Sequence, residues 1–296
     1  MIAPDDRGSA IEAMSRADAL VTMEQAWTAD LAAALRAASR VRWIQLLNAG
    51  FDRLEAFGVP PHVVVSTIGG AGSHFVAEHA LMLLLALLRK APSMLHAQSR
   101  REWAFDSVVR EISSLQGKEV AVLGFGHIGR RVAALAAALG ARVVGIARSS
   151  RRDRDGFDVV SLADVRDVYP RADALVVALP LSADTAGLID AAALGRMKEG
   201  AYLVNVSRGQ IVVTDALVAA LESGRLAGAG LDVVDPEPLP PGHPLWSLPN
   251  VIITPHVAWA GGGAAARRSI EDLVVENVRR FARGERVRNA AAIEYR

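Results

Sequence analysis

The sequence predicts an α/β protein organised around a doubly wound parallel sheet. Between Val120 and Ile253, short apolar runs alternate with longer segments whose apolar residues recur at helical spacing. A glycine-rich turn joins one of these runs directly to a helical segment, and polar residues follow several others. Sheets of this kind bind ligands beyond the carboxyl ends of their strands, so these polar residues are the candidate site.

The composition suits a globular chain of about two domains and narrows the classes of partner. The chain has 296 residues, a net charge of +1 and no cysteine. This charge favours neither nucleic acid nor a membrane surface as a partner, and the longest apolar run, Ala80 to Leu88, is too short to span a bilayer. No signal peptide is evident, disulfides are excluded, and the histidines have no metal-binding spacing. We therefore expect a cytoplasmic protein without a metal.

The first part of the chain is predicted to form a small β/α domain. Its expected elements are a helix at 6–16, a strand at 17–23, a helix at 28–38 capped by Thr28, and strands at 42–47 and 63–65. The segment His74 to Lys90 is apolar nearly all round, which indicates a buried helix, and Pro92 offers a break after it. We assign residues 1–91 and a returning helix at 264–296 to this domain, and residues 92–263 to a second domain.

The second domain contains the glycine-rich turn, in the segment Val120–Gly129 (VAVLGFGHIG). Gly124 allows a tight turn, Gly126 lets a pyrophosphate approach the backbone, and Gly129 lets the helix and strand pack closely. The N–H groups at the start of the helix would hold the anion. This context predicts a Rossmann-type dinucleotide-binding domain; the alternative is a glycine turn in another α/β protein. The predicted cofactor-binding residues of the turn are Gly124, Phe125, Gly126, His127, Ile128 and Gly129.

The residues that follow the next strand, at 141–147, determine whether such a domain prefers NAD or NADP. An acidic residue about 20 positions after the glycines usually binds the adenosine ribose 2′-hydroxyl. No carboxylate stands there; Arg148 and Ser149 do. A guanidinium pairs with phosphate through a planar fork, so the pair predicts NADP, with NAD possible. The alternative is a solvated basic loop.

Later strands are expected near Val159 and at 174–178, 202–206, 228–232 and 251–253, with a helix at 214–223 capped by Thr214. Polar segments follow three of these strands: NVSRG (205–209), DVVDPEP (232–238) and TPH (254–256). Arg208 could hold a substrate carboxylate, and His256 could protonate a carbonyl oxygen while Glu237 orients its ring. Each residue alone has an ordinary structural explanation, but their joint placement predicts reduction of a keto acid.

These motifs resemble the D-isomer-specific 2-hydroxyacid dehydrogenase family, and within it the glyoxylate and hydroxypyruvate reductases. The resemblance covers almost the whole chain, from NAGFD and VAEHALMLLLALLR through LQGKEVAVLGFGHIGRRVA, ALPLSADTAGLI, MKEGAYLVNVSRG and GLDVVDPEPLP to TPHVAW. It implies that Arg208, Glu237 and His256 are catalytic. The implied reaction is reduction of a small 2-keto acid to the D-2-hydroxy acid, with NADPH favoured over NADH.

The resemblance also implies further site residues and an oligomeric state. Ala49 and Gly50 match backbone positions that receive the substrate carboxylate, and Asp232 matches an aspartate near the nicotinamide. Leu179, Pro180 and Ser207 match residues lining the cofactor cleft. Trp259 is expected either to wall the substrate pocket or to lie in the core. Similar proteins form homodimers and carry a smaller flavodoxin-like substrate domain.

One departure concerns that smaller domain. Family members begin with a strand and helix before the segment matching ADALV, whereas about 16 residues precede it here. We therefore expect a substrate domain that lacks its first strand. Two alternative functions also stay open: a nicotinamide-sensing protein without catalysis, and a formate or phosphite dehydrogenase. Glu237 argues against a formate dehydrogenase, because the formate dehydrogenases that resemble this pattern have glutamine at the matching position.

Overall fold

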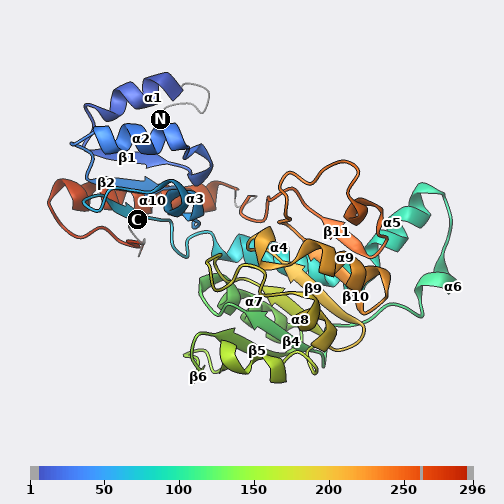
Figure 1. Cartoon of the computed structure of the whole chain (residues 1–296). Helices are drawn as coiled ribbons and strands as arrows, with labels where there is room; N and C mark the ends of the chain where they lie inside the picture. Colours follow the sequence, from blue (N-terminus) through green and yellow to red (C-terminus); the bar gives the residue numbers. More distant parts are fainter. Residues whose placement is uncertain (1–6, 261–262, 292–296) are drawn as a thin grey trace. The chain divides into compact units, whose positions relative to one another are not determined.

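The structure is a computed structural model that describes residues 7–260 and 263–291 and divides into two compact units (Figure 1). Unit 1 comprises Met1–Gly72 and Gly262–Arg296, and unit 2 comprises Ser73–Gly261.

Unit 2 contains an eight-stranded sheet in the order β11-β10-β9-β8-β4-β5-β7-β6. Neighbouring strands are parallel, apart from the short edge strand β6. The strands are β4 (Glu119–Leu123), β5 (Arg142–Ala147), β6 (Arg151–Arg152), β7 (Asp158–Ser161), β8 (Ala174–Val177), β9 (Ala201–Asn205), β10 (Leu226–Leu231) and β11 (Val251–Ile253). From β4 the chain adds β5 and β7 on one side and then crosses to place β8 on the other side of β4. The point between β4 and β8 is therefore the topological switch point, where such sheets bind ligands. The predicted doubly wound parallel sheet is confirmed.

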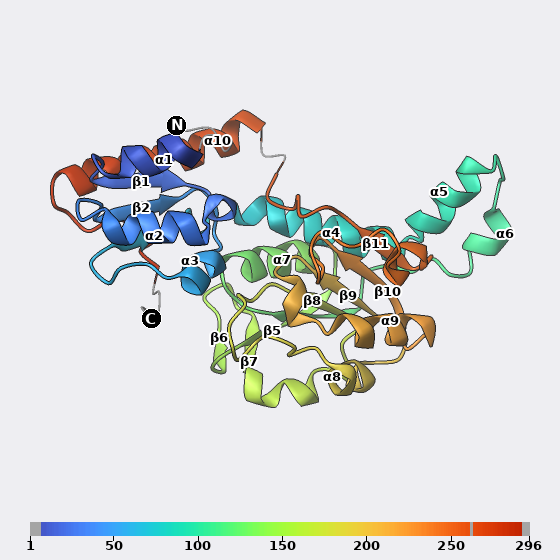
Figure 2. The ribbon, with the colours of Figure 1, turned by 45° about the horizontal axis from the view of Figure 1, so that its top comes forward.

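Helices cover both faces of this sheet (Figure 2). On one face α4 (Ser73–Leu88) packs against α7 (His127–Ala138); on the other lie η2 (Leu162–Asp167), α8 (Ala191–Arg196) and α9 (Thr214–Glu222). The side chains of β4 alternate accordingly: Val120 and Val122 pack with α4 and α7, whereas Ala121 and Leu123 face the opposite core. Burial on both faces explains why these strands are continuous apolar runs. The remaining elements of the unit are α5 (Ala91–Ser99), α6 (Phe105–Val108), η3 (Gly209–Ile211) and η4 (Pro244–Ser247).

The boundary between the units falls before α4, not after it. Two glycines of β10 let α4 lie directly on the sheet, because a Cβ at Gly230 would come within 2.8 Å of the Leu83 side chain and one at Gly228 within 3.1 Å of Leu87. The structural division, Gly72 to Ser73, therefore differs from the predicted boundary at residue 91 by one helix. A second difference is α9, which starts at Thr214 with Val213 as its N-cap residue, so the predicted cap at Thr214 is wrong.

Unit 1 contains a parallel three-stranded sheet in the order β1-β2-β3. Its elements are α1 (Arg7–Met14), β1 (Ala19–Thr22), η1 (Glu24–Ala26), α2 (Ala29–Ala37), β2 (Trp43–Leu46), α3 (Asp52–Phe57), β3 (Val64–Ser66) and α10 (Gly263–Ala282). Thr28 caps α2 as predicted, accepting a hydrogen bond from the Leu31 N–H at 3.3 Å. Within the described ranges no strand precedes β1, which pairs with β2 alone and forms an edge of the sheet.

The returning helix α10 belongs to unit 1, as predicted, and is attached there by a buried polar network. The Asn277 amide donates to Gln45 Oε1 at 2.8 Å and accepts from the Arg288 N–H at 2.7 Å. Gln45 Oε1 also accepts from the Ser66 hydroxyl at 2.8 Å. Because these buried groups satisfy one another, the network fixes the position of α10 without an unpaired polar atom.

Among the residues that the structure describes, no single helix is long and apolar enough to cross a bilayer, although α4 and α5, which meet at a bend of 67°, reach the required length and composition together.

Candidate functional site

The glycine turn after β4 has the geometry of a phosphate cradle. Gly124 has a φ of +100°, and a Cβ there would lie 2.5 Å from the backbone nitrogen of Leu179. A Cβ on Gly129 would lie 2.0 Å from the Gly124 carbonyl oxygen, so α7 begins directly against the turn. At Gly126, by contrast, a Cβ would meet no protein atom within 4 Å. Gly126 is the N-cap residue of α7, and no side chain caps the helix. These residues therefore fit a dinucleotide pyrophosphate, which would accept from the N–H groups at the helix start.

The three residues between the glycines differ in exposure. The Phe125 ring is buried against β5, where a Cβ on Gly145 would come within 2.4 Å of it, and it packs edge-on against Phe157 at 6.0 Å. Phe125 can therefore face a cofactor only through its backbone. His127 is exposed, and Ile128 is half-buried against the core. For these residues too, backbone placement is what the turn offers a ligand.

Arg148 and Ser149 lie exposed after β5. A second arginine, Arg151, which was not predicted as a site residue, approaches the glycine turn. Arg151 Nη2 donates to the Phe125 carbonyl at 3.5 Å, and Nη1 donates to the Ser149 carbonyl at 3.3 Å. The β6–β7 hairpin carries Arg151 back over the turn. No sequence spacing predicts that Arg151 lies near the turn, because its position depends on the antiparallel register of the two-residue strand β6.

A buried ion pair anchors this hairpin to α7. Arg130 Nε lies 3.0 Å from both carboxylate oxygens of Asp153, which follows β6 directly. Burial of Asp153 opposes its ionisation, but the hydrogen bonds and charge of Arg130 outweigh that effect, so the pKa of Asp153 lies below its ordinary value. The Arg130–Asp153 pair therefore fixes the hairpin relative to the glycine turn.

The loops after β8 and β9 are joined by a hydrogen bond between two predicted cofactor residues. The Ser207 hydroxyl donates to the Leu179 carbonyl. Leu179 is buried in the core and Pro180 is exposed beside it. The structure thus brings these three residues together at the carboxyl edge of the sheet.

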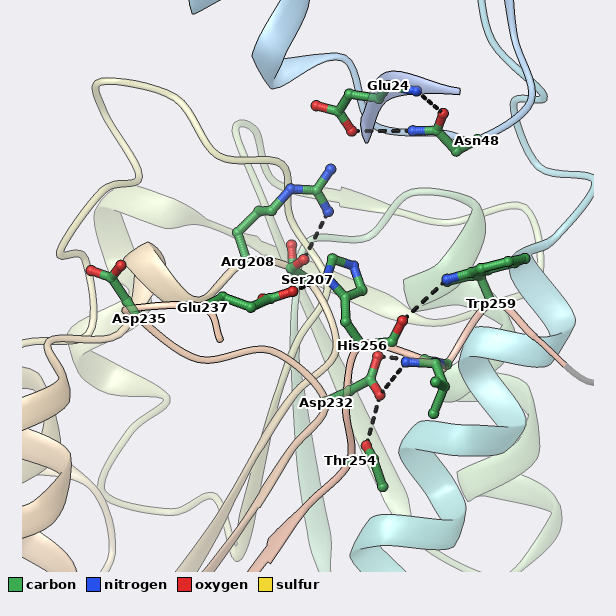
Figure 3. Close-up of polar contacts among 12 residues, drawn as sticks. Glu24, Asn48, Ser207, Arg208, Asp232, Asp235, Glu237, Thr254, His256 and Trp259 are labelled. Atoms are coloured by element: carbon green, nitrogen blue, oxygen red, sulfur yellow. Dashed lines mark hydrogen bonds and ion pairs between the residues drawn. The ribbon is translucent and has the colours of Figure 1, made fainter. Parts of the chain in front are cut away.

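Arg208 is presented by a loop that Asn205 shapes from within. Asn205 is buried; its side chain accepts from the Ser207 N–H at 3.1 Å and donates to the Arg208 carbonyl at 2.9 Å. Arg208 itself is half-buried and donates from Nη1 to the Ser207 carbonyl at 2.9 Å (Figure 3). A Cβ on Gly209 would lie 2.0 Å from the Val234 carbonyl oxygen, so only glycine lets this loop pack against the loop that carries Glu237. Asn205 therefore positions the Arg208 loop, a role that was not predicted. Its place at the end of β9, directly before the loop, is the sequence feature that could have indicated this role.

His256 and Glu237 form a direct pair. His256 Nδ1 lies 2.7 Å from Glu237 Oε1, and both side chains are partly exposed (Figure 3). His256 has a φ of 54°, and its N–H donates to the Asp232 carbonyl at 2.8 Å. Because Glu237 engages Nδ1, Nε2 is the ring nitrogen available for proton transfer to a ligand.

Asp232 lies beneath this pair and holds the loop that follows His256. Its side chain is 1% exposed; Oδ1 accepts from the Val257 N–H at 2.9 Å, and Oδ2 accepts from the Ala258 N–H at 3.0 Å. The Thr254 hydroxyl donates to Oδ1 at 2.7 Å. Asp232 therefore supports the His256 loop; contact with a cofactor, as the resemblance implies, stays a prediction.

Trp259 follows in the same loop and is not part of the core. Its side chain is exposed (55%), and its indole N–H donates to the His256 carbonyl at 3.1 Å. The core interpretation is therefore wrong, whereas a role against substrate stays a prediction.

In unit 1, the loop after β2 carries Ala49 and Gly50 and is held by a reciprocal pair. The Glu24 N–H donates to Asn48 Oδ1 at 2.9 Å, and Asn48 Nδ2 donates to Glu24 Oε2 at 3.1 Å (Figure 3). Asn48 Nδ2 also donates to the Gly50 carbonyl at 2.9 Å. Glu24 and Asn48 were not predicted, and they define the loop in which the two predicted substrate residues lie.

The described residues contain no group of three or more His, Asp or Glu side chains that could hold a metal ion.

Residues 81–258 match the family model of the D-isomer specific 2-hydroxyacid dehydrogenase NAD binding domain. The chain is 34% identical to a glyoxylate reductase from Aeropyrum pernix, covering 85% of this chain and 76% of that protein. It is 35% identical to a D-3-phosphoglycerate dehydrogenase from Mycobacterium tuberculosis, covering 97% of this chain and 53% of that protein.

A solved structure of similar fold is the NADPH-dependent glyoxylate/hydroxypyruvate reductase from Sinorhizobium meliloti, determined in complex with NADP and sulfate. It is 27% identical to this chain, with a TM-score of 0.79, and the match covers 93% of this chain and 84% of that one.

Proposed function

Because the chain belongs to the D-isomer specific 2-hydroxyacid dehydrogenase family, we propose that it reduces a small 2-keto acid to the D-2-hydroxy acid with NADPH. The observation that carries this proposal is the pairing of His256 with Glu237 at 2.7 Å, beyond the carboxyl ends of two strands of the cofactor-binding sheet. This pair supplies an oriented proton donor where a doubly wound sheet binds its ligand.

The proposed reaction divides the work among three side chains. A reduced nicotinamide, when bound, would supply the hydride that the carbonyl carbon receives. His256 gives the proton on Nε2 to the carbonyl oxygen, and Glu237 holds the ring through Nδ1 and stabilises the imidazolium before transfer. Arg208 holds the substrate carboxylate and polarises the carbonyl through its planar fork. In the reverse direction His256 accepts the hydroxyl proton.

For the substrate, we propose a small 2-keto acid of the glyoxylate or hydroxypyruvate type. Within unit 2, Arg208 would bind the substrate carboxylate and Trp259 would contact the remaining part of the substrate. Ala49 and Gly50 of unit 1 stay predicted carboxylate contacts, as the family resemblance implies. The similarity to a glyoxylate reductase and to a glyoxylate/hydroxypyruvate reductase supports this class.

The preference for NADPH rests on the basic residues at the end of β5. Arg148, Ser149 and Arg151 would bind the 2′-phosphate, because guanidinium and hydroxyl groups donate to phosphate where an acidic residue would repel it. The approach of Arg151 to the glycine turn supports this assignment.

We further propose a homodimer formed through an arm that comprises residues 91–112 and includes α5 and α6 (Figure 1). The arm exposes five large apolar residues, of which three are more than 60% exposed: Leu95 (64%), Trp103 (95%) and Phe105 (62%), beside Met94 and Val109. An exposed apolar surface of this size is typical of a protein–protein interface, and in a two-fold dimer the same patch of each copy would meet its counterpart. The exposed charges around it have both signs, so like charges alone would not oppose such a contact. These charged residues are Arg100, Arg101, Glu102, Asp106, Arg110 and Glu111. The double variant Trp103→Ser, Phe105→Ser should sediment as a monomer.

The function is tested by following oxidation of NADPH and of NADH in parallel with glyoxylate, hydroxypyruvate, pyruvate, phenylpyruvate and 3-phosphohydroxypyruvate, and reduction of NAD and NADP with formate and with phosphite. Keto-acid turnover that is clearly faster with NADPH is the expected result. Tight cofactor binding with no turnover of any pair would instead favour the sensing protein. Oxidation of formate or phosphite would assign the chain to another dehydrogenase class.

A further inference from the structure

His79 lies on α4, and its ring contacts the loop that carries His256 within unit 2. His79 Nε2 lies 2.8 Å from Thr254 Oγ1 and 3.4 Å from Asp232 Oδ1. Its side chain is largely buried (16% exposed), so these two contacts form mostly away from solvent. A histidine from a distant helix therefore meets the residues that support His256.

The direction of these hydrogen bonds follows from counting protons. Both oxygens of Asp232 face donors, so the carboxylate accepts from the Thr254 hydroxyl at 2.7 Å. A hydroxyl has one hydrogen, and Thr254 has therefore none left for His79. His79 must donate, which places a proton on its Nε2. His79 therefore donates to Thr254, and Thr254 donates to Asp232. His79 Nε2 also lies 3.4 Å from Asp232 Oδ1.

The end of this relay holds the backbone on which His256 depends. Asp232 accepts from the N–H groups of Val257 and Ala258, and its carbonyl accepts from the His256 N–H. His256 has a φ of 54°, a conformation that non-glycine residues adopt only when their surroundings impose it. A buried carboxylate also needs donors or opposite charge to offset its loss of hydration. Loss of the His79 N–H would remove one of the two hydrogen bonds that orient the Thr254 hydroxyl toward Asp232.

We propose that His79 is a positioning residue for the proposed acid/base: through Thr254 and Asp232 it holds residues 254–258 in the conformation that sets the His256 ring against Glu237. His79 itself contacts neither of those two side chains. This proposal rests on the proposed function only in the role it gives to His256; the placement of the loop is a property of the chain alone.

The test replaces His79 by leucine, which fills similar space but cannot donate, and by glutamine, whose amide N–H can donate at similar reach. His79→Leu should lower kcat about ten- to hundredfold, as expected for a lost hydrogen bond to a charged network. The Kd for NADPH should stay within about twofold, and His79→Gln should recover most of kcat. His62→Leu, which changes an exposed histidine of unit 1, is the matched control and should leave kcat unchanged.

A second readout needs no turnover. Amide hydrogen exchange at Val257 and Ala258, whose N–H groups bond to Asp232, should accelerate in His79→Leu and return toward the native rate in His79→Gln. Thr254→Val should have the same effect, and the double variant should lose no more than the larger single loss, because the two residues act in one relay. If the wild type has no keto-acid turnover, the function fails while exchange still tests the relay. Unchanged exchange and unchanged kcat in His79→Leu, or a glutamine variant as impaired as leucine, would overturn the positioning role.

Discussion

His256 Nδ1 and Glu237 Oε1 lie 2.7 Å apart, although the two residues are 19 positions apart in the sequence and stand on different loops. Gly209 contributes to this arrangement, because its lack of a side chain lets the Arg208 loop pack against the backbone at Val234, in the loop that carries Glu237. The pair gives the ring a fixed orientation and an adjacent negative charge.

Glu237→Gln should reduce kcat while leaving the Kd for NADPH unchanged. Glutamine keeps the size of the side chain but removes the charge, and a charge-assisted hydrogen bond contributes about 1.5 to 3 kcal/mol, or about ten- to hundredfold in rate. Steady-state kinetics with the best keto acid and a fluorescence titration of NADPH measure the two quantities. Asp235→Asn removes a charge from the same loop at a site that does not contact His256 and is the control. Native turnover in Glu237→Gln would exclude the orienting role.

Arg208→Lys should lose most of kcat/KM for the keto acid. Lysine keeps the positive charge but cannot bind a carboxylate and polarise a carbonyl with one planar fork. The loss should be about a hundredfold or more and should appear in the substrate parameters, not in cofactor affinity. Arg225→Lys, at an arginine that bonds the carbonyls of Gly195 and Met197 away from the site, serves as the comparison. An Arg208→Lys enzyme with native kcat/KM would show that a charge alone suffices.

Arg151→Ser should shift the cofactor preference toward NADH. The guanidinium of Arg151 lies over the glycine turn, so its removal should raise the KM for NADPH about tenfold and leave that for NADH nearly constant. Arg152→Ser is a close control, since Arg152 pairs with exposed Asp158 on the same hairpin. Asp153→Asn should produce a weaker form of the same shift by loosening the hairpin from Arg130. Equal changes for both cofactors would indicate general damage to the fold.

Gly126→Ala and Gly129→Ala should separate binding from stability. An alanine Cβ at Gly126 meets no protein atom within 4 Å, so the melting temperature should be unchanged while NADPH affinity falls. At Gly129 the Cβ would lie 2.0 Å from a backbone oxygen, so the protein itself should be destabilised. Thermal unfolding without cofactor, together with NADPH titration, distinguishes the two outcomes. A Gly126→Ala variant with native affinity would place the pyrophosphate elsewhere.

Asp173 should contribute to stability only above acidic pH. Burial opposes its ionisation, but the Lys198 ammonium at 2.7 Å and the Glu119 N–H at 2.8 Å outweigh burial and hold the pKa of Asp173 below its ordinary value of 3.8. A lowered folded-state pKa means that this stabilisation is fully present above the unfolded-state pKa and is lost as pH falls through the folded-state value. Urea unfolding between pH 6 and about pH 2.5 should therefore show a shallower acid decline for Asp173→Asn than for wild type. Asp184→Asn, at an exposed position, is the control.

Local sequence patterns predicted those elements whose cause is local. Thr28 caps α2 because its hydroxyl needs only an N–H three residues away, and the strand at 120–123 is apolar because helices cover both its faces. Predictions failed where a distant segment intervened. Thr214 was expected to cap α9, but its hydroxyl donates instead to the Asp235 carbonyl at 2.7 Å, and this tertiary contact outweighs the local preference.

The sequence by itself determined the fold class, the phosphate turn and the three residue types of the proposed chemistry, because glycine spacing, apolar periodicity and strand-end polarity depend on neighbours along the chain. Only the tertiary structure decided that α4 belongs with the cofactor sheet, that Arg151 returns over the turn, and that His79 supports the His256 loop. Each of these depends on which segments the packed sheet brings together. Register, close backbone approach and buried hydrogen bonds set that pairing, and none of them has a fixed spacing in the sequence.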